Sequence, residues 1–187
     1  MKVLSVNVGR PRVVQSEGEP VDTGIFKHPV KGRPFVRRLN IVGDEQADLR
    51  NHGGTDKAVY AYPHEYYEYW RGQYPGLNLP FGAFGENLTV EGLLDIDVRI
   101  GDRLGIGSAQ LRVTQPRIPC YKLGIRLGRP DIVRRFVRSE YCGFYLAVEC
   151  EGEIGAGDAV SIVASDAGAA TVTQAFRTHL GRRDGPT

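Results

Sequence analysis

Cys120 is the side chain of this sequence best placed to do chemistry. It lies in a loop that Pro116 and Pro119 stiffen, and Arg117 and Lys122 stand close to it along the chain. Neighbouring positive charges lower the pKa of a thiol from its usual value of about 8.5, and the thiolate is the form that attacks electrophiles and binds metals. The pattern therefore indicates a reactive or metal-binding cysteine. The alternative is a buried loop cysteine beside ordinary surface charges.

A second candidate site is a polar segment that ends at Lys57. Asp44, Asp48 and His52 are spaced by four residues, so a helix would place them on one face as metal ligands. The Gly53-Gly54 pair would end such a helix and would let backbone N–H groups approach an anion. A solvated turn is the alternative for this segment.

Further polar groups could read a ligand. In Phe84-Gly85-Glu86-Asn87, a glycine turn precedes an asparagine whose amide could pair with the donor and acceptor edge of a heterocycle. Cations that could meet a phosphate are Lys27, Arg37, Arg38 and Lys57. Taken singly, each of these is more often a surface cation.

Short strands must position these side chains. The 24 glycines and 11 prolines are spread along the chain, as expected where many strands are joined by turns. We predict a mainly β fold with two capping helices, one from Pro63 to Trp70 and one that begins at Pro130. The predicted strands are 2–8, 24–27, 36–41, 57–62, 87–90, 110–114, 144–150 and 159–163.

The last residues and the other cysteines have simpler interpretations. Cys142 and Cys150 share one face of a predicted strand, so we expect both to be small core side chains. After Val163 the composition changes to Ala, Ser, Asp and Gly, which indicates a linker and a loosely attached C-terminal tail over 164–187.

Composition excludes several classes of function. The net charge is +2, from 24 Lys and Arg against 22 Asp and Glu, so neither nucleic acid nor a membrane is an expected partner. The first residues lack the apolar run of a signal peptide, and no segment reaches the length of a membrane span. Three cysteines without a CxxC pair predict neither a disulfide framework nor a structural zinc site. A cytoplasmic location is expected.

Four motifs together resemble the MOSC family, named for the C-terminal domain of molybdenum cofactor sulfurases, and in particular its bacterial YiiM-like branch. The resemblance covers Lys2 to Val163 and implies a β-barrel domain over 1–163. The motifs, in order, are Gly24-Ile25-Phe26-Lys27, Gly43-Asp44 through His52-Gly53-Gly54 to Lys57-Ala58-Val59-Tyr60, Phe84-Gly85-Glu86-Asn87-Leu88, and Pro116-Arg117-Ile118-Pro119-Cys120-Tyr121-Lys122-Leu123.

This resemblance also implies a cofactor and its contacts. Cys120 would be the protein ligand of a molybdenum cofactor, Lys27 would meet its phosphate and Asn87 would lie on the pterin. The further cofactor contacts that the resemblance suggests are Arg38, Gly53, Gly54, Lys57 and Arg117. Pyridoxal phosphate binding is a second association of the family as a whole.

The implied activity is the reduction of N-hydroxylated small molecules such as hydroxylaminopurine-type bases and amidoximes. His52 is the expected proton donor, because its unperturbed pKa of about 6.5 allows exchange near neutral pH. The sequence has no cysteine-rich cluster motif and no GxGxxG turn between a strand and a helix, so a separate reductase would deliver the electrons.

Two other functions stay open at this point. The chain could be a non-enzymatic carrier that holds the cofactor, or sulfur on Cys120, for a client enzyme. Cys120 and His52 could alternatively form a hydrolytic Cys–His pair. For the oligomeric state, a homodimer is one option.

Overall fold

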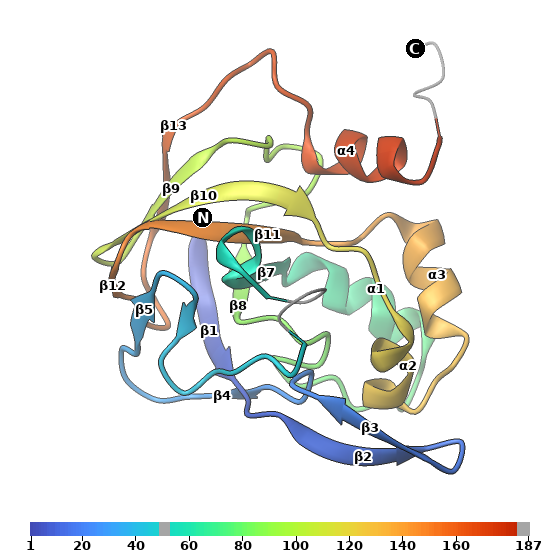
Figure 1. Ribbon diagram of the computed structural model, residues 1–187. Helices are drawn as coiled ribbons and strands as arrows, with labels where there is room; N and C mark the ends of the chain where they lie inside the picture. The colour runs from blue at the N-terminus through green and yellow to red at the C-terminus, as the bar shows by residue number, and fades with distance from the viewer. Residues whose placement is uncertain (49–52, 183–187) are drawn as a thin grey trace.

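The structure is a computed structural model, and it describes residues 1–48 and 53–182. Its largest sheet has eight strands in the order β13-β9-β10-β11-β7-β8-β1-β4 (Figure 1). All neighbours in this sheet are antiparallel except β7 and β8, which are parallel. The strands are β1 (Lys2–Val8), β4 (His28–Pro29), β7 (Val59–Pro63), β8 (Leu88–Glu91), β9 (Arg103–Ile106), β10 (Ala109–Pro116), β11 (Phe144–Cys150) and β13 (Val160–Ala164).

Two smaller sheets accompany the large one. A three-stranded sheet has the order β12-β5-β6, and β2 and β3 form a two-stranded hairpin. The prediction of a mainly β fold is therefore confirmed. These strands are β2 (Arg12–Ser16), β3 (Glu19–Thr23), β5 (Phe35–Arg37), β6 (Asn40–Ile41) and β12 (Gly152–Glu153).

The expected β-barrel is not formed, because the strand pairing of the described residues does not close into a ring. An isolated bridge between Lys2 and Ala159 joins β1 to the residues just before β13. The bonds from Val3 N to Asp158 O, 2.9 Å, and from Gly157 N to Val3 O, 2.8 Å, reach the turn at Gly157, and the bond from Val160 N to Met1 O, 3.0 Å, reaches only the first residue of β13. The contact therefore stays a bridge and does not become a ladder.

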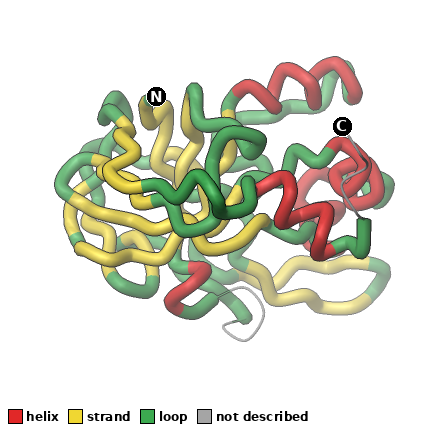
Figure 2. The backbone as a smooth tube through the Cα atoms, turned by 90° about the horizontal axis from the view of Figure 1, so that it is seen from above, coloured by secondary structure: helices red, strands yellow, loops and turns green. Residues whose placement is uncertain are grey.

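The four α-helices of the described residues lie towards one end of the molecule and most of the strands towards the other, while the β2–β3 hairpin extends to the helix end (Figure 2). The two predicted helices are confirmed as α1 (Glu65–Gln73) and α3 (Ile132–Ser139). A short 3-10 helix, η1, spans Thr55–Lys57. The helix α2 (Tyr121–Leu127) starts directly after Cys120, where the sequence predicts that the loop continues. It ends at Gly128, whose left-handed backbone (φ 63°) lets its N–H reach the carbonyls of Gly124 and Ile125.

An aromatic cluster attaches α1 and α3 to the large sheet. Trp70 and Phe136 stack at 5.7 Å between ring centroids, and Tyr62 stacks on Phe84 at 4.7 Å. The indole of Trp70 donates to the Tyr62 hydroxyl at 2.7 Å, which satisfies two polar atoms inside the core. All four side chains are fully buried, so the helix end of the fold is held by packed aromatic surface.

Some sequence predictions of local structure are wrong. Residues 24–27 are loop, and residues 36–41 contain a turn between β5 and β6. The C-terminal segment is not loosely attached over residues 171–180, because α4 (Val172–His179) contacts β10 and buries Val172 and Phe176 completely. Thr171 and Gln174 form a reciprocal capping box at its start. The domain boundary at residue 163 stays a prediction.

In the two described ranges, no helix combines the length and apolar character that crossing a membrane would require.

Candidate functional site

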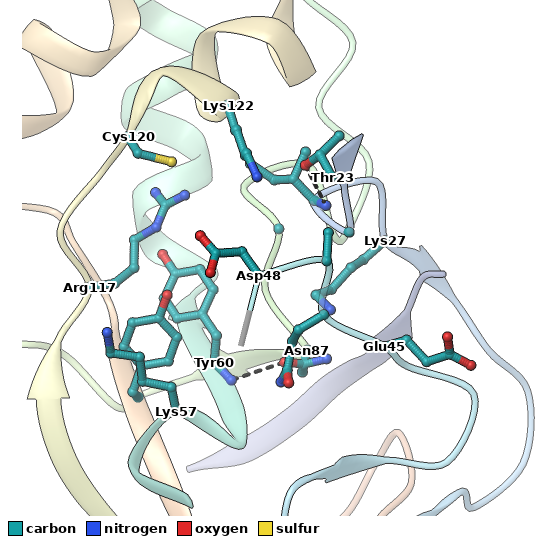
Figure 3. A pocket seen from close by; sticks show the side chains of 16 residues that line it. Thr23, Lys27, Glu45, Asp48, Lys57, Tyr60, Asn87, Arg117, Cys120 and Lys122 are labelled. Atoms are coloured by element: carbon teal, nitrogen blue, oxygen red, sulfur yellow. Dashed lines mark hydrogen bonds between the residues drawn. The ribbon is translucent and has the colours of Figure 1, made fainter. Parts of the chain in front are cut away.

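A pocket with about 610 Å³ of empty space, partly open to solvent, lies where α2, the end of β3, η1 and β7 approach one another (Figure 3). Figure 3 shows Cys120 and Arg117 on one side of the pocket and Lys27 and Asn87 on the other. The lining residues are Thr23, Gly24, Ile25, Lys27, Glu45, Gln46, Ala47, Asp48, Lys57, Tyr60, Gly85, Asn87, Arg117, Cys120, Lys122 and Tyr145.

The first turn of α2 places Cys120 at the pocket. Cys120 is the N-cap residue, with an extended backbone at φ −124° and ψ 173°, so the chain changes direction there and the helix leads away from the pocket. The thiol is half-buried, while the next residue, Tyr121, is 60% exposed. Lys122 donates to the backbone oxygen of Asp22 at 2.8 Å, which ties α2 to the end of the β2–β3 hairpin. The cysteine is thus both held in place and accessible.

Arg117 is the charged group of the wall beside Cys120. It is 5% exposed, and its guanidinium lies 5.3 Å from the centroid of the Tyr60 ring and 5.2 Å from that of Phe136. Burial disfavours its charge, but the acidic groups Tyr60, Tyr145 and Cys120 outweigh this and raise the pKa of Arg117. Its Nη1 atom has no hydrogen-bond partner among the described residues.

A buried N–H donor without a partner costs about 1–3 kcal/mol, and more when the group is charged. Proteins rarely leave such donors unpaired. Because Arg117 lines the pocket, the unpaired Nη1 favours a ligand that brings a hydrogen-bond acceptor, and the positive charge favours an anion.

Tyr60 and Tyr145 form the aromatic wall next to Arg117. They are register partners on β7 and β11, with ring centroids 5.4 Å apart. Tyr60 donates to the backbone oxygen of Cys142 at 2.8 Å, and the Lys57 ammonium lies 5.9 Å from the Tyr145 ring centroid. Burial raises the pKa of both phenols, although the charge of Arg117 opposes the rise. Both rings therefore stay neutral near pH 7.

Lys27 and Asp44 form a buried ion pair on the opposite side. The Lys27 ammonium donates to Asp44 Oδ1, which also accepts from the backbone N–H of Gly9 at 2.8 Å. Asn87 donates to Asp44 Oδ2 at 2.9 Å. Burial lowers the pKa of Lys27, and the carboxylate of Asp44 opposes that shift. The ion pair uses one of the three N–H donors of the ammonium, so Lys27 keeps capacity for a phosphate.

Asn87 uses its amide to hold the chain together. Its Nδ2 also donates to the backbone oxygen of Asn7 at 3.2 Å, and its Oδ1 accepts from the backbone N–H of Tyr60 at 3.0 Å. Both Nδ2 hydrogens are therefore engaged, and one acceptor position on Oδ1 is left. The predicted contact of Asn87 with a pterin stays a prediction, and the structure shows a residue that positions Lys27 and Tyr60.

The structure separates other predicted site residues from the pocket. Arg38 lines a different, open depression together with Thr55, Asp56, Arg112, Ala147, Val148 and Glu149. Gly53 and Gly54 do not line the pocket, but Gly54 (φ 92°) precedes η1, whose last residue is Lys57. His52 lies outside the described residues.

The helix that would have placed Asp44 and Asp48 on one face is not present, since residues 43–48 form turns and loop. Within 1–48 and 53–182, no group of three His, Cys, Asp or Glu side chains is placed to hold a metal ion. Asp44 is instead the counter-ion of Lys27, and Asp48 lines the pocket.

Sequence reasoning missed Tyr60 and Tyr145 as parts of the site. A signal was available for Tyr60, because it is the last residue of the motif that contains Lys57. No local pattern connects Tyr145 with Arg117, which come together only through the pairing of β10 with β11.

Fold and site together define a class: a mainly β domain with a thiol and several cations at one pocket. Residues 48–161 match the MOSC domain family, and this chain belongs to that family. The resemblance drawn from the four motifs is thereby confirmed.

The chain is similar to an uncharacterised protein, YflK of Bacillus subtilis, with 44% identity over 155 residues, 83% of this chain and 70% of YflK. It is 37% identical to protein YiiM of Escherichia coli over 79% of this chain and 66% of that protein. A protein named reductase from Gibberella moniliformis is 34% identical over 86% of this chain, which covers only 29% of the fungal protein.

Among solved structures, the crystal structure of YiiM from Geobacillus stearothermophilus superposes with a TM-score of 0.78 at 34% identity. The superposition covers 95% of this chain and 83% of that one. The mainly β architecture with four helices is thus a YiiM-like MOSC fold.

The pocket residues fit the cofactor with which MOSC domains are associated. Molybdenum cofactor is an anionic group whose metal prefers soft sulfur ligands, and Cys120 offers such a ligand. Arg117 offers a buried cationic donor without a partner among the described residues, and Lys27, Lys57 and Lys122 line the same pocket.

Proposed function

We propose that this protein binds the molybdenum cofactor through Cys120 and reduces N-hydroxylated small molecules, with hydroxylaminopurine-type bases and amidoximes as the substrate class. The observation that supports this proposal is the half-buried Cys120 thiol in the same pocket as the buried Arg117, whose Nη1 lacks a partner among the described residues. A thiol beside a cationic hydrogen-bond donor that no described residue satisfies suits an anionic group whose metal prefers sulfur ligands.

Each side of the pocket has a distinct part in the proposal. Cys120 is the metal ligand, Arg117 donates to an anionic part of the cofactor, and Lys27 and Lys57 add positive charge for its phosphate. Tyr60 and Tyr145 exclude water beside Arg117. When bound, the cofactor supplies two-electron redox chemistry, which the protein's own side chains cannot provide.

The overall reaction converts R–NHOH, two electrons and two protons into R–NH2 and water. His52 stays the proposed proton donor. The electrons come from a separate reductase, and the fungal relative named reductase supports this, because the matched region is only 29% of that protein. A cytoplasmic location also belongs to the proposal.

The test compares wild type with Cys120→Ala, both purified without oxygen from a host that makes the cofactor. Molybdenum is measured by elemental analysis and the pterin by fluorescence after oxidation. Turnover of an N-hydroxylated purine is then followed with a reduced viologen dye. We expect near-stoichiometric metal and substrate-dependent dye oxidation in wild type, and loss of both in the variant. Full turnover in Cys120→Ala would refute the assignment.

The carrier alternative predicts a different result from the same proteins. A carrier would hold the cofactor in wild type, transfer it to an apo-enzyme and leave the dye unoxidised. Cys120→Ser is the conservative control, because it keeps the size of the side chain and replaces a soft thiolate with a hard hydroxyl oxygen.

A further inference from the structure

The positive charge of this chain is concentrated around Cys120 and the two helices that follow it. Residues 117–140 contain seven of the 24 Lys and Arg but only two of the 22 Asp and Glu. This segment therefore carries a charge of +5, and the rest of the chain carries −3 within a total of +2. A charge so localised produces a directed field, whereas the net charge alone predicts almost none.

Four arginines present this charge to solvent, and we call them the basic helix face: Arg129, Arg134, Arg135 and Arg138. Arg135 pairs with Asp131 at 2.9 Å, and its guanidinium lies 5.3 Å from the Tyr74 ring centroid. The second acidic residue of the segment, Glu140, is paired with Arg177 at 2.8 Å. Both carboxylates are thus already engaged, so the face keeps an excess of positive charge.

The basic helix face is connected to the proposed cofactor ligand through α2. Cys120 is the N-cap of α2, and α2 packs against α3, which carries three of the four arginines. Figure 1 shows the two helices side by side, on the opposite side of the molecule from β5. Tyr121 is 60% exposed, so a partner at these helices would come within one residue of the thiol.

We propose that the basic helix face is the docking site of an acidic electron-carrier protein that reduces the cofactor held by Cys120. This inference rests on the proposed function. Charge complementarity selects the partner, because exposed arginines attract carboxylates, and aromatic and Arg side chains are enriched at protein interfaces. A one-electron carrier docks twice per turnover, and the two electrons delivered in this way, with two protons, convert R–NHOH into R–NH2 and water.

Association is tested with a plant-type ferredoxin as the acidic probe, by calorimetry at low and high salt. Arg134→Glu with Arg138→Glu reverses two exposed charges and leaves Arg129 and Arg135, which contact Tyr74, in place. Lys2→Glu with Lys31→Glu is the matched control, since it makes the same change of charge at exposed positions outside residues 117–140. We expect salt-sensitive binding that the first variant weakens more than about tenfold, because like charges placed opposite each other cost several kcal/mol.

Equal weakening in both variants, or in neither, would overturn the docking site. Dye-driven turnover of the loaded proteins separates this result from the proposed function, because a small viologen does not need the basic helix face. Turnover with dye should be the same in wild type and both variants, while ferredoxin-driven turnover falls only in Arg134→Glu with Arg138→Glu. Absence of dye-driven turnover in loaded wild type would refute the proposed function itself.

Discussion

The two sides of the pocket differ in how completely their polar groups are paired. On the side of Lys27, the ammonium, the Asp44 carboxylate and the Asn87 amide bind one another and the backbone. On the side of Cys120, the Arg117 Nη1 is buried without a partner among the described residues. The polar groups of the first side are paired with one another, although the Lys27 ammonium keeps donors for a phosphate, whereas the second side has a buried donor that none of the described residues satisfies.

This difference separates residues that build a site from residues that bind its ligand. A satisfied buried network makes the fold rigid, and breaking it costs stability. An unsatisfied buried donor lowers the stability of the free protein, and a ligand that accepts its hydrogen bond restores that stability. Variants of Asp44 should therefore mainly change the free energy of unfolding, and variants of Arg117 should mainly change ligand retention.

The largest effect on stability is expected for Asp44→Ala. This change leaves the Lys27 ammonium buried without its counter-ion and removes the acceptor of Gly9 N and Asn87 Nδ2. Loss of one partner of a buried ion pair costs about 3–5 kcal/mol. Urea denaturation of the cofactor-free proteins measures this loss directly.

The double variant Lys27→Met with Asp44→Ala is the control for that experiment. It removes the buried charge together with its counter-ion, so part of the lost stability should return. A single variant that loses less than about 1 kcal/mol would show that the Lys27 side is not the rigid half of the pocket.

Asp95 is a buried carboxylate with no basic counter-ion among the described residues, unlike Asp44. It accepts from the backbone N–H groups of Cys142 and Gly143 at 2.9 and 2.8 Å, and burial raises its pKa to about 7. Between pH 4 and pH 7 the Asp95 carboxyl is therefore protonated in the folded state and ionised in the unfolded chain. Its contribution to the free energy of unfolding is complete below pH 4 and is lost as the pH rises towards 7.

Asp95→Asn should remove this dependence, since an amide does not titrate. The free energy of unfolding of wild type relative to Asp95→Asn should fall between pH 5 and 7 by a few kcal/mol at most and level off above that. Urea denaturation at each pH measures both proteins. A difference that stays constant over this range would mean that Asp95 is ionised in the folded protein.

Regular local patterns were enough to predict much of the fold. Strands 2–8 and 144–150 match β1 and β11, because their apolar and β-branched residues favour extended chain whatever their partners. The helix from Pro130 follows from its apolar stripe. Barrel closure could not be predicted from such patterns, since it depends on whether the turn at Gly157 extends into a ladder with β1. The attachment of the C-terminal segment likewise depends on the burial of Phe176 against residues far away in the sequence.

The site was predictable where its chemistry is local. Cys120, Arg117 and Lys57 line the pocket as the motifs indicated. Asp44 was read as a metal ligand because spacing along the chain cannot show that Lys27 lies against it. The same limit explains Arg38, because the turn between β5 and β6 places it in a different depression.

Arg117→Met tests the Cys120 side of the pocket. The change removes a buried charge and its unpaired N–H but also the contacts with Tyr60 and Phe136, so these effects oppose each other. We expect the free energy of unfolding to change by no more than about 1 kcal/mol. Molybdenum content after purification should nevertheless fall clearly. A loss of stability like that of Asp44→Ala would place Arg117 in the structural network.

The smallest effect is expected for Arg38→Ala, although the family resemblance suggested Arg38 as a cofactor contact. The residue is exposed and lines the depression that contains Asp56 and Arg112, so its removal should leave the pocket unchanged. Stability should change by less than about 0.5 kcal/mol, as for most surface substitutions. Molybdenum content and dye-driven turnover should equal those of wild type. Loss of cofactor in Arg38→Ala, as expected for Arg117→Met, would mean that the bound cofactor also contacts the depression lined by Arg38.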